Sequence, residues 1–145
     1  MLILASASPR RHELLKAAQI EHVVRPSNIP EQRLPNELPE ELVQRLAQEK
    51  ARSICGEPED VILGADTVVC VEGEVLGKPC NLEEAAQMLQ KLSGRDHRVL
   101  TGICLRHGSR TIVDLAVTRV WFRSLENQEL SSYLATRESM DKAGG

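Results

Sequence analysis

The pattern of apolar positions predicts short strands that alternate with amphipathic helices. Strand-length apolar runs occupy residues 2–5, 23–24 and 61–71, and a hairpin turn at 72–74 leads into a short strand at 75–76. Two further runs at 97–105 and 111–122 flank a Gly108-Ser109 turn. Helical spacing of apolar residues is found at 9–19, 39–54, 82–92 and 126–135. The first helix is expected to bury Leu14, Leu15 and Ala18. This order favours a single α/β domain over residues 1–145, with a mixed, twisted sheet flanked by helices.

The first of these helices begins in an unusual way. Ser8 is suited to cap it and Pro9 to be its first residue. Arg10 and Arg11 follow at the end where the helix dipole is already positive, which is unfavourable unless an anion is present. Free N–H groups, the hydroxyls of Ser6 and Ser8 and two guanidiniums suit a phosphate group. A capped helix with solvated arginines explains the pattern equally well.

An isolated acid and an inward lysine are the next candidates. Asp66 is the only charged residue in the apolar run 61–71. Because burying an unpaired carboxylate is costly, Asp66 either caps a turn beside Gly64 or belongs to a site, and the site is favoured. Lys50 lies four residues after Leu46 and four before Ile54, on the inward stripe of its helix. Spacing alone slightly favours a stem that covers apolar surface over an amine aimed into a site.

Composition limits the partners that fit this chain. The net charge is −3 over 145 residues, and aromatic residues make up 2%, so neither a basic field nor stacking platforms for a nucleic-acid polymer are expected. Four cysteines without a C-x-x-C pair indicate reduced thiols rather than a zinc site. With no signal-peptide pattern and no apolar segment of membrane-spanning length, a cytoplasmic location is expected.

Histidines and nucleotide-binding motifs add little. His97 is expected to be a hydrogen-bonded structural residue. His12, His22 and His107 show no spacing that would pair them in a site and are expected to lie on the surface. The Rossmann and Walker A motifs are both absent, so a phosphate site here would be of another kind.

Seven motifs that keep their order along the chain resemble the Maf family of septum-formation-protein-like nucleotide pyrophosphatases. They are S-A-S-P-R-R at 6–11, E-Q-R at 31–33, E-K-A-R at 49–52, G-A-D-T-V-V at 64–69, G-K-P at 77–79, L-S-G-R-D-H-R-V-L-T-G at 92–102 and M-D-K-A-G at 140–144. The resemblance implies a house-cleaning hydrolase that converts nucleoside triphosphates to monophosphates and pyrophosphate. It also implies a fold similar to inosine triphosphate pyrophosphatases and a need for Mg²⁺ or Mn²⁺.

Site residues follow from the same resemblance. It makes Asp66 the proton acceptor, with Glu31 and Lys50 catalytic beside it, and leaves Asp66 or Glu31 as the metal ligand. The Asp66-Thr67 pair is similar to the branch that acts on dTTP and UTP. Substrate binding is implied for Ser6, Ser8, Arg10, Arg11, Thr67, Lys78 and Lys142.

The chain also departs from the family pattern. Pro30 replaces the acidic residue that usually precedes Glu31. Trp121 stands where a smaller residue is common, which suggests a packing change. The sequence ends at Gly145. The family pattern continues into a glutamine-containing segment, a strand pair and a helix, so an uncovered apolar face and an open sheet edge are expected. Alternatives are therefore an inactive chain that binds a nucleotide or a septum-formation partner, or a 7-methylguanosine triphosphate pyrophosphatase. A homodimer is also considered.

Overall fold

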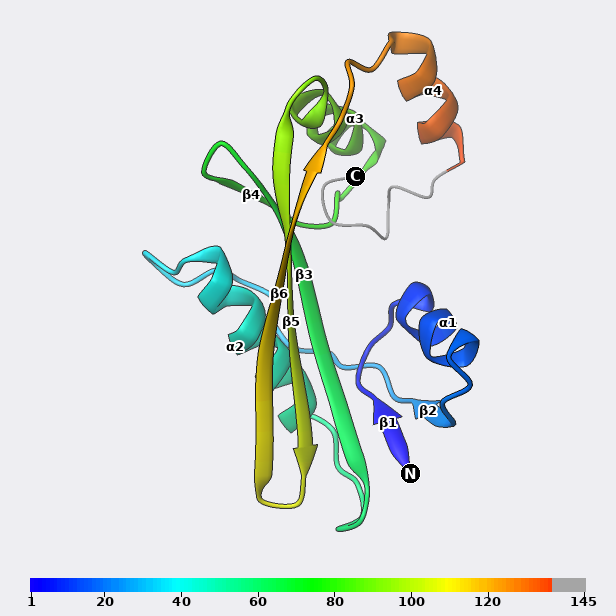
Figure 1. The fold of residues 1–145 in the computed structure, drawn as a ribbon, viewed down its shortest axis with the longest axis vertical. Helices are drawn as coiled ribbons and strands as arrows, with labels where there is room; N and C mark the ends of the chain where they lie inside the picture. The colour runs from blue at the N-terminus through cyan, green and yellow to red at the C-terminus, as the bar shows by residue number, and fades with distance from the viewer. Residues whose placement is uncertain (137–145) are drawn as a thin grey trace. The chain divides into compact units, whose positions relative to one another are not determined.

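The computed structural model describes residues 1–136, which form a mixed α/β fold (Figure 1). The strands are β1 Leu2–Leu4, β2 His22–Val24, β3 Val61–Val71, β4 Glu74–Leu76, β5 Asp96–His107 and β6 Arg110–Trp121. The helices are α1 Pro9–Ala17, α2 Pro39–Arg52, α3 Leu82–Leu92 and α4 Asn127–Ala135. Every element expected from the apolar pattern is confirmed, with ends that differ by a few residues.

The strands form one six-stranded sheet in the order β2-β1-β3-β5-β6, with β4 paired to β3. β1 is parallel to both β2 and β3, and its Leu4 lies opposite Val24 and Leu63. β4 runs antiparallel to β3, as a strand that follows a tight turn must. The sheet is therefore mixed, as the sequence predicts.

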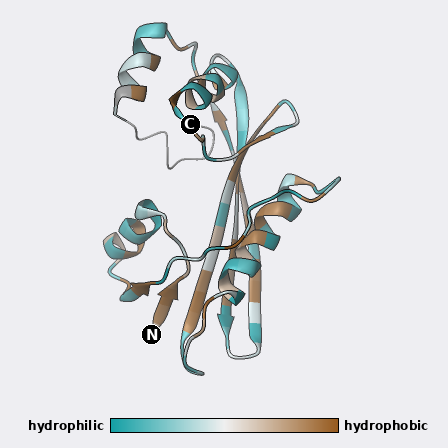
Figure 2. Ribbon diagram, turned by 180° about the vertical axis from the view of Figure 1, so that it is seen from behind, coloured by the Kyte–Doolittle hydropathy of each residue, from teal (hydrophilic) through white to brown (hydrophobic). Residues whose placement is uncertain are grey.

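The chain divides into two compact units, which are described separately. Unit 1 contains residues 1–66 and 101–116, and unit 2 contains residues 67–100 and 117–145. The core of unit 1 is formed by Ile3, Ala5, Ala47, Ala51, Ile62 and Cys104. The core of unit 2 is formed by Val69, Val71, Leu76, Met88 and Leu92. Figure 2 shows the apolar residues of unit 1 along β1 and on one side of α2.

Two glycines allow α2 to lie directly on the sheet in unit 1. A Cβ added to Gly64 of β3 would lie 2.2 Å from the carbonyl oxygen of Ala47, and one added to Gly102 of β5 would lie 2.4 Å from that of Val43. No side chain fits at such distances, so the helix backbone packs against bare strand backbone. This close approach brings the C-terminal half of α2 beside the stretch of β3 that contains Asp66.

The prediction that α1 buries a stripe of its own is wrong. None of its residues is buried, Leu14 is 69% exposed, and Leu15 and Ala18 are not buried either. Helical spacing identified the helix correctly, but no described element covers this face. The periodicity of apolar residues shows which of them share a face of the helix. Whether that face is buried depends on another element that packs against it.

Candidate active site

Lys50 joins two carboxylates in unit 1. Its Nζ lies 2.7 Å from Oε1 of Glu31 and 3.1 Å from Oδ1 of Asp66, and it also donates to the carbonyl oxygen of Ala65. Lys50 is only 7% exposed, as is Asp66. The expectation from spacing, that the amine reaches solvent, is therefore wrong, and the amine points into a cluster of charges. Helix α2, strand β3 and the loop before α2 each supply one member.

Asp66 keeps one oxygen available. Its Oδ1 is bound by Lys50, whereas its buried Oδ2 has no hydrogen-bond partner among the described residues. Burial raises the pKa of Asp66, the charge of Lys50 opposes that rise, and the charge of Glu31 adds to it. A buried carboxylate with an unused acceptor atom is suited to receive a proton or to bind a cation.

The start of α1 brings a second cation toward this cluster. Ser8 caps the helix by accepting from the backbone N–H of Arg11, as expected. The Oγ of buried Ser6 accepts from the N–H of Ser8 at 3.1 Å and from Nη1 of Arg11 at 3.3 Å. Burial lowers the pKa of Arg11, while the charges of Asp66 and Glu31 oppose that shift. Arg11 therefore interacts electrostatically with both carboxylates and remains positively charged.

The other predicted site residues that the structure describes lie in α1, in β3 and in unit 2. Arg10 is exposed in the first turn of α1. Thr67 follows Asp66 directly in β3, where unit 2 begins, and Lys78 is an exposed residue of unit 2. Lys142 lies outside the described residues. Unit 1 thus brings together Ser6, Ser8, Arg11, Glu31, Lys50 and Asp66.

Sequence reasoning missed a buried ion pair beside this cluster. Glu37 is 7% exposed, and both of its carboxylate oxygens accept hydrogen bonds from the guanidinium of Arg45, at 2.7 and 2.9 Å. These bonds lower the pKa of Glu37 and raise that of Arg45. The available signal was an acid in a proline-rich loop directly before a helix that carries an arginine.

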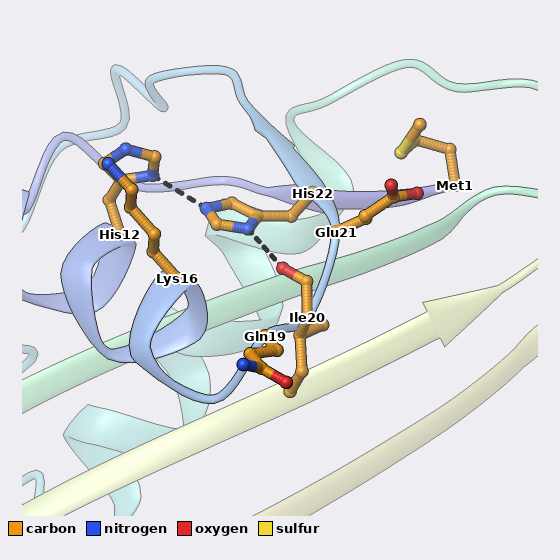
Figure 3. Close-up of a pocket in the computed structure, with 7 residues that line it drawn as sticks. All are labelled: Met1, His12, Lys16, Gln19, Ile20, Glu21 and His22. Atoms are coloured by element: carbon orange, nitrogen blue, oxygen red, sulfur yellow. Dashed lines mark hydrogen bonds between the residues drawn. The ribbon is translucent and has the colours of Figure 1, made fainter.

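A separate pocket in unit 1 contains none of the predicted site residues (Figure 3). It is lined by Met1, His12, Lys16, Gln19, Ile20, Glu21 and His22. Nδ1 of His12 lies 2.7 Å from Nε2 of His22, and Nδ1 of His22 lies 2.9 Å from the carbonyl oxygen of Ile20. Because that carbonyl can only accept, neutral His22 carries its proton on Nδ1 and accepts from His12. His12 lies on the surface as expected, whereas His22 is half-buried, and the contact between them is one that their spacing in the sequence does not indicate.

Unit 2 contains the one histidine predicted to be structural. His97 is buried and packs edge-on against Phe122 with ring centroids 4.9 Å apart, and burial lowers its pKa. Its Nδ1 has no hydrogen-bond partner within the described part of the chain, so the expected hydrogen bond is not seen at that atom. All four cysteines are free, as expected. Over residues 1–136, no helix is long and apolar enough to cross a bilayer.

The sequence model for Maf-like proteins matches residues 1–145, the full chain. The protein belongs to the Maf family. The Maf motifs at 6–11, 31–33, 49–52 and 64–69 supply the six residues that unit 1 gathers.

Curated Maf relatives cover nearly all of this chain. It is 44% identical over 144 residues to the dTTP/UTP pyrophosphatase of Koribacter versatilis, covering 99% of this chain and 75% of the relative. The dTTP/UTP pyrophosphatase of Bacillus velezensis is 46% identical, with 99% and 76% covered. That of Thermococcus gammatolerans is also 46% identical, with 99% and 77% covered. The chain thus spans about three quarters of the length of these relatives.

Solved structures confirm the expected fold class. A HAM1 protein from Coxiella burnetii matches with a TM-score of 0.51 at 17% identity, over 81% of this chain and 70% of that chain. The Ham1 protein of Staphylococcus aureus matches with a TM-score of 0.54 at 14% identity, over 81% and 69%. At these identities the likeness concerns the fold alone.

The donor set of the Lys50 cluster is compatible with a hard divalent cation. Mg²⁺ is usually held by one or two carboxylates together with water and substrate phosphates. Oδ2 of Asp66 is an unused acceptor, and Glu31 is a half-exposed carboxylate on the same lysine. Among residues 1–136 there is no group of three or more His, Cys, Asp or Glu side chains that could hold an ion. Phosphate and water oxygens would therefore complete the coordination.

Proposed function

We infer that this protein is a nucleoside triphosphate pyrophosphatase that hydrolyses dTTP and UTP to the monophosphate and pyrophosphate. The observation that carries the inference is the buried Asp66, with one oxygen fixed by Lys50 and the other without a partner among the described residues. The curated relatives named dTTP/UTP pyrophosphatases support the substrate class.

The roles proposed for the residues follow from their charges. Water attacks the α-phosphorus, and the bond to the pyrophosphate leaving group breaks. Oδ2 of Asp66 accepts the proton of that water, because it is the oxygen that Lys50 leaves unused. Lys50 keeps the carboxylate oriented, and its charge and that of Arg11 stabilise negative charge on the phosphoryl oxygens.

The remaining proposed contacts concern substrate binding. The hydroxyls of Ser6 and Ser8 and the first turn of α1 bind phosphate oxygens together with Arg11. Arg10, Thr67, Lys78 and Lys142 are proposed to contribute to substrate binding and choice. Glu31, or Asp66 in place of its role as proton acceptor, would hold Mg²⁺ or Mn²⁺, which when bound neutralises phosphate charge and lowers the pKa of a bound water.

Pyrophosphate release from dTTP, UTP, CTP and 7-methylguanosine triphosphate, with and without Mg²⁺, tests the function. We expect turnover of dTTP and UTP that depends on Mg²⁺. Preference for the methylated purine would favour the other family branch. No turnover of any substrate by folded protein would favour a chain that only binds its partner.

Two substitutions test the assigned roles. We expect Asp66→Asn and Lys50→Ala each to lower kcat by about 10²- to 10⁴-fold, the usual contribution of a general base. Asp114→Asn and Lys16→Ala are matched controls on exposed residues of unit 1 and should keep wild-type rates. Retained activity in Asp66→Asn would refute its role, and circular dichroism verifies that each variant is folded.

A further inference from the structure

Arg45 of α2 connects the loop that carries Glu31 to the helix that carries Lys50. Its Nη2 donates to the carbonyl oxygen of Gln32 at 2.7 Å, and its Nε and Nη2 donate to the Glu37 carboxylate at 2.7 and 2.9 Å. Its Nη1 donates to Glu49 in the same helix at 3.1 Å. One guanidinium therefore fixes two points of the loop and is itself held by α2.

The anchored loop is folded tightly on itself. The N–H of Leu34 donates to Oε1 of Glu37 at 3.0 Å, and the N–H of Glu37 donates to the carbonyl oxygen of Leu34 at 3.1 Å. Nε of Arg33 donates to the carbonyl oxygen of Glu37 at 2.8 Å. Glu37 is buried, so its charge depends on these donors. The loop and α2 thus behave as one body while Arg45 is in place.

Glu31 is the residue of this loop that forms an ion pair with Lys50. Its carboxylate lies 2.7 Å from Nζ of Lys50, yet its side chain is 50% exposed and it belongs to an irregular loop. An ion pair with one exposed partner holds a flexible side chain weakly. Gln32 is the next residue along the chain, so fixing its carbonyl oxygen restricts where the Glu31 backbone can lie.

We propose that Arg45 is a positioning residue for hydrolysis, which holds Glu31 against Lys50 through Gln32 and Glu37. The inference rests on the proposed function, in which Glu31 takes part. Arginine suits the task because its planar fork offers five N–H donors, enough for a carboxylate, a carbonyl and a second carboxylate together. Arg45 itself touches none of the proposed reacting groups.

The first test replaces Arg45 by methionine. We expect Arg45→Met to lower kcat/KM for dTTP by about tenfold to a hundredfold, because a small misplacement at a site can reduce the rate by that factor. Arg52→Met is the matched control: it removes the same charge from the same helix, but Arg52 is exposed and donates to Gln48. The control should keep wild-type kinetics.

A double-mutant cycle with Glu31→Gln separates positioning from general damage. If Arg45 acts through Glu31, adding Arg45→Met to Glu31→Gln lowers kcat/KM no further. A full multiplicative loss in that background would overturn the proposal. Should Arg45→Met alone be unfolded, Glu37→Leu with Arg45→Met removes the anchor without leaving a buried charge, and the same cycle applies.

Hydrogen exchange gives a readout that does not depend on turnover. In Arg45→Met the amides of Leu34 and Glu37 should exchange faster than in the wild type, while those of β1 stay unchanged. Unchanged exchange at Leu34 and Glu37 overturns the proposal. If the wild type hydrolyses no nucleotide but Arg45→Met still speeds exchange at Leu34 and Glu37, the proposed function is refuted while the anchoring of the loop by Arg45 stands. The failure of the proposed function can therefore be distinguished from the failure of the anchor.

Discussion

At the scale of single residues, the ionisation of Asp66 is governed by opposing influences. Burial and the charge of Glu31 raise its pKa, while Lys50 and Arg11 lower it, and the net shift is upward from the ordinary value of 3.8. A carboxylate that accepts a proton must first be ionised. The environment therefore gives Asp66 a higher proton affinity than an exposed aspartate has.

This predicts the acid side of the pH profile. Below its pKa Asp66 is protonated and cannot accept a proton, so kcat/KM should fall as the pH decreases through that value. Since the pKa is raised, the midpoint should lie above pH 3.8. Initial rates of pyrophosphate release across the pH range measure it. The residual activity of Asp66→Asn should lack this limb, and a midpoint at or below 3.8 would contradict the environment described for Asp66.

At the scale of elements, the packing of α2 on β3 and β5 places the lysine. Gly64→Ala and Gly102→Ala would each push a methyl group into the helix backbone, at 2.2 and 2.4 Å from the nearest carbonyl oxygen. We expect each to lower the free energy of unfolding by at least about 1–3 kcal/mol, the usual cost of overpacking. Urea denaturation monitored by circular dichroism measures the change.

A third glycine provides the control for this prediction. Gly77 has nothing within 4 Å of an added Cβ and no positive φ, so Gly77→Ala should leave the unfolding free energy nearly unchanged. Wild-type stability in Gly64→Ala would show that α2 does not approach β3 as closely as described. Gly64→Ala should also reduce turnover, because moving α2 moves Lys50 away from Asp66.

Local patterns predicted the elements well and their partners poorly. Period-two and helical spacing located the six strands and four helices, because these signals are local. The helical spacing also showed that Lys50 points inward, but it did not show how deeply its amine is buried. That depth depends on Gly64 and Gly102, which lie far from Lys50 along the chain and near α2 in space. The prediction that Leu14 is buried was wrong for the same reason, because no local signal says which element covers a helix.

At the scale of the whole molecule, the candidate site is assembled by chain topology. Ser6, Glu31, Lys50 and Asp66 come from four separate segments of unit 1, which the parallel pairing of β1 with β3 and the packing of α2 bring together. The residue pattern alone made Ser6 and Asp66 candidate site residues, whereas Glu31 and the catalytic role of Lys50 came from the motif resemblance. Arg45 and Glu37 were missed because their bonds join a loop and a helix whose docking no local pattern describes.

The exposed apolar residues of β6 allow a test of the fold as a whole. β6 is an edge strand, and Ile112 is 65% exposed, Val117 49% and Trp121 71%. The packing change expected at Trp121 is not seen, because its side chain lies in solvent. Trp121 is the only tryptophan, so we expect the fluorescence of dilute protein to show the long-wavelength emission of a water-exposed indole and strong quenching by acrylamide. Short-wavelength, protected emission at every dilution would mean that Trp121 is covered within a single chain. Protection that disappears on dilution would instead reveal association of copies through this edge.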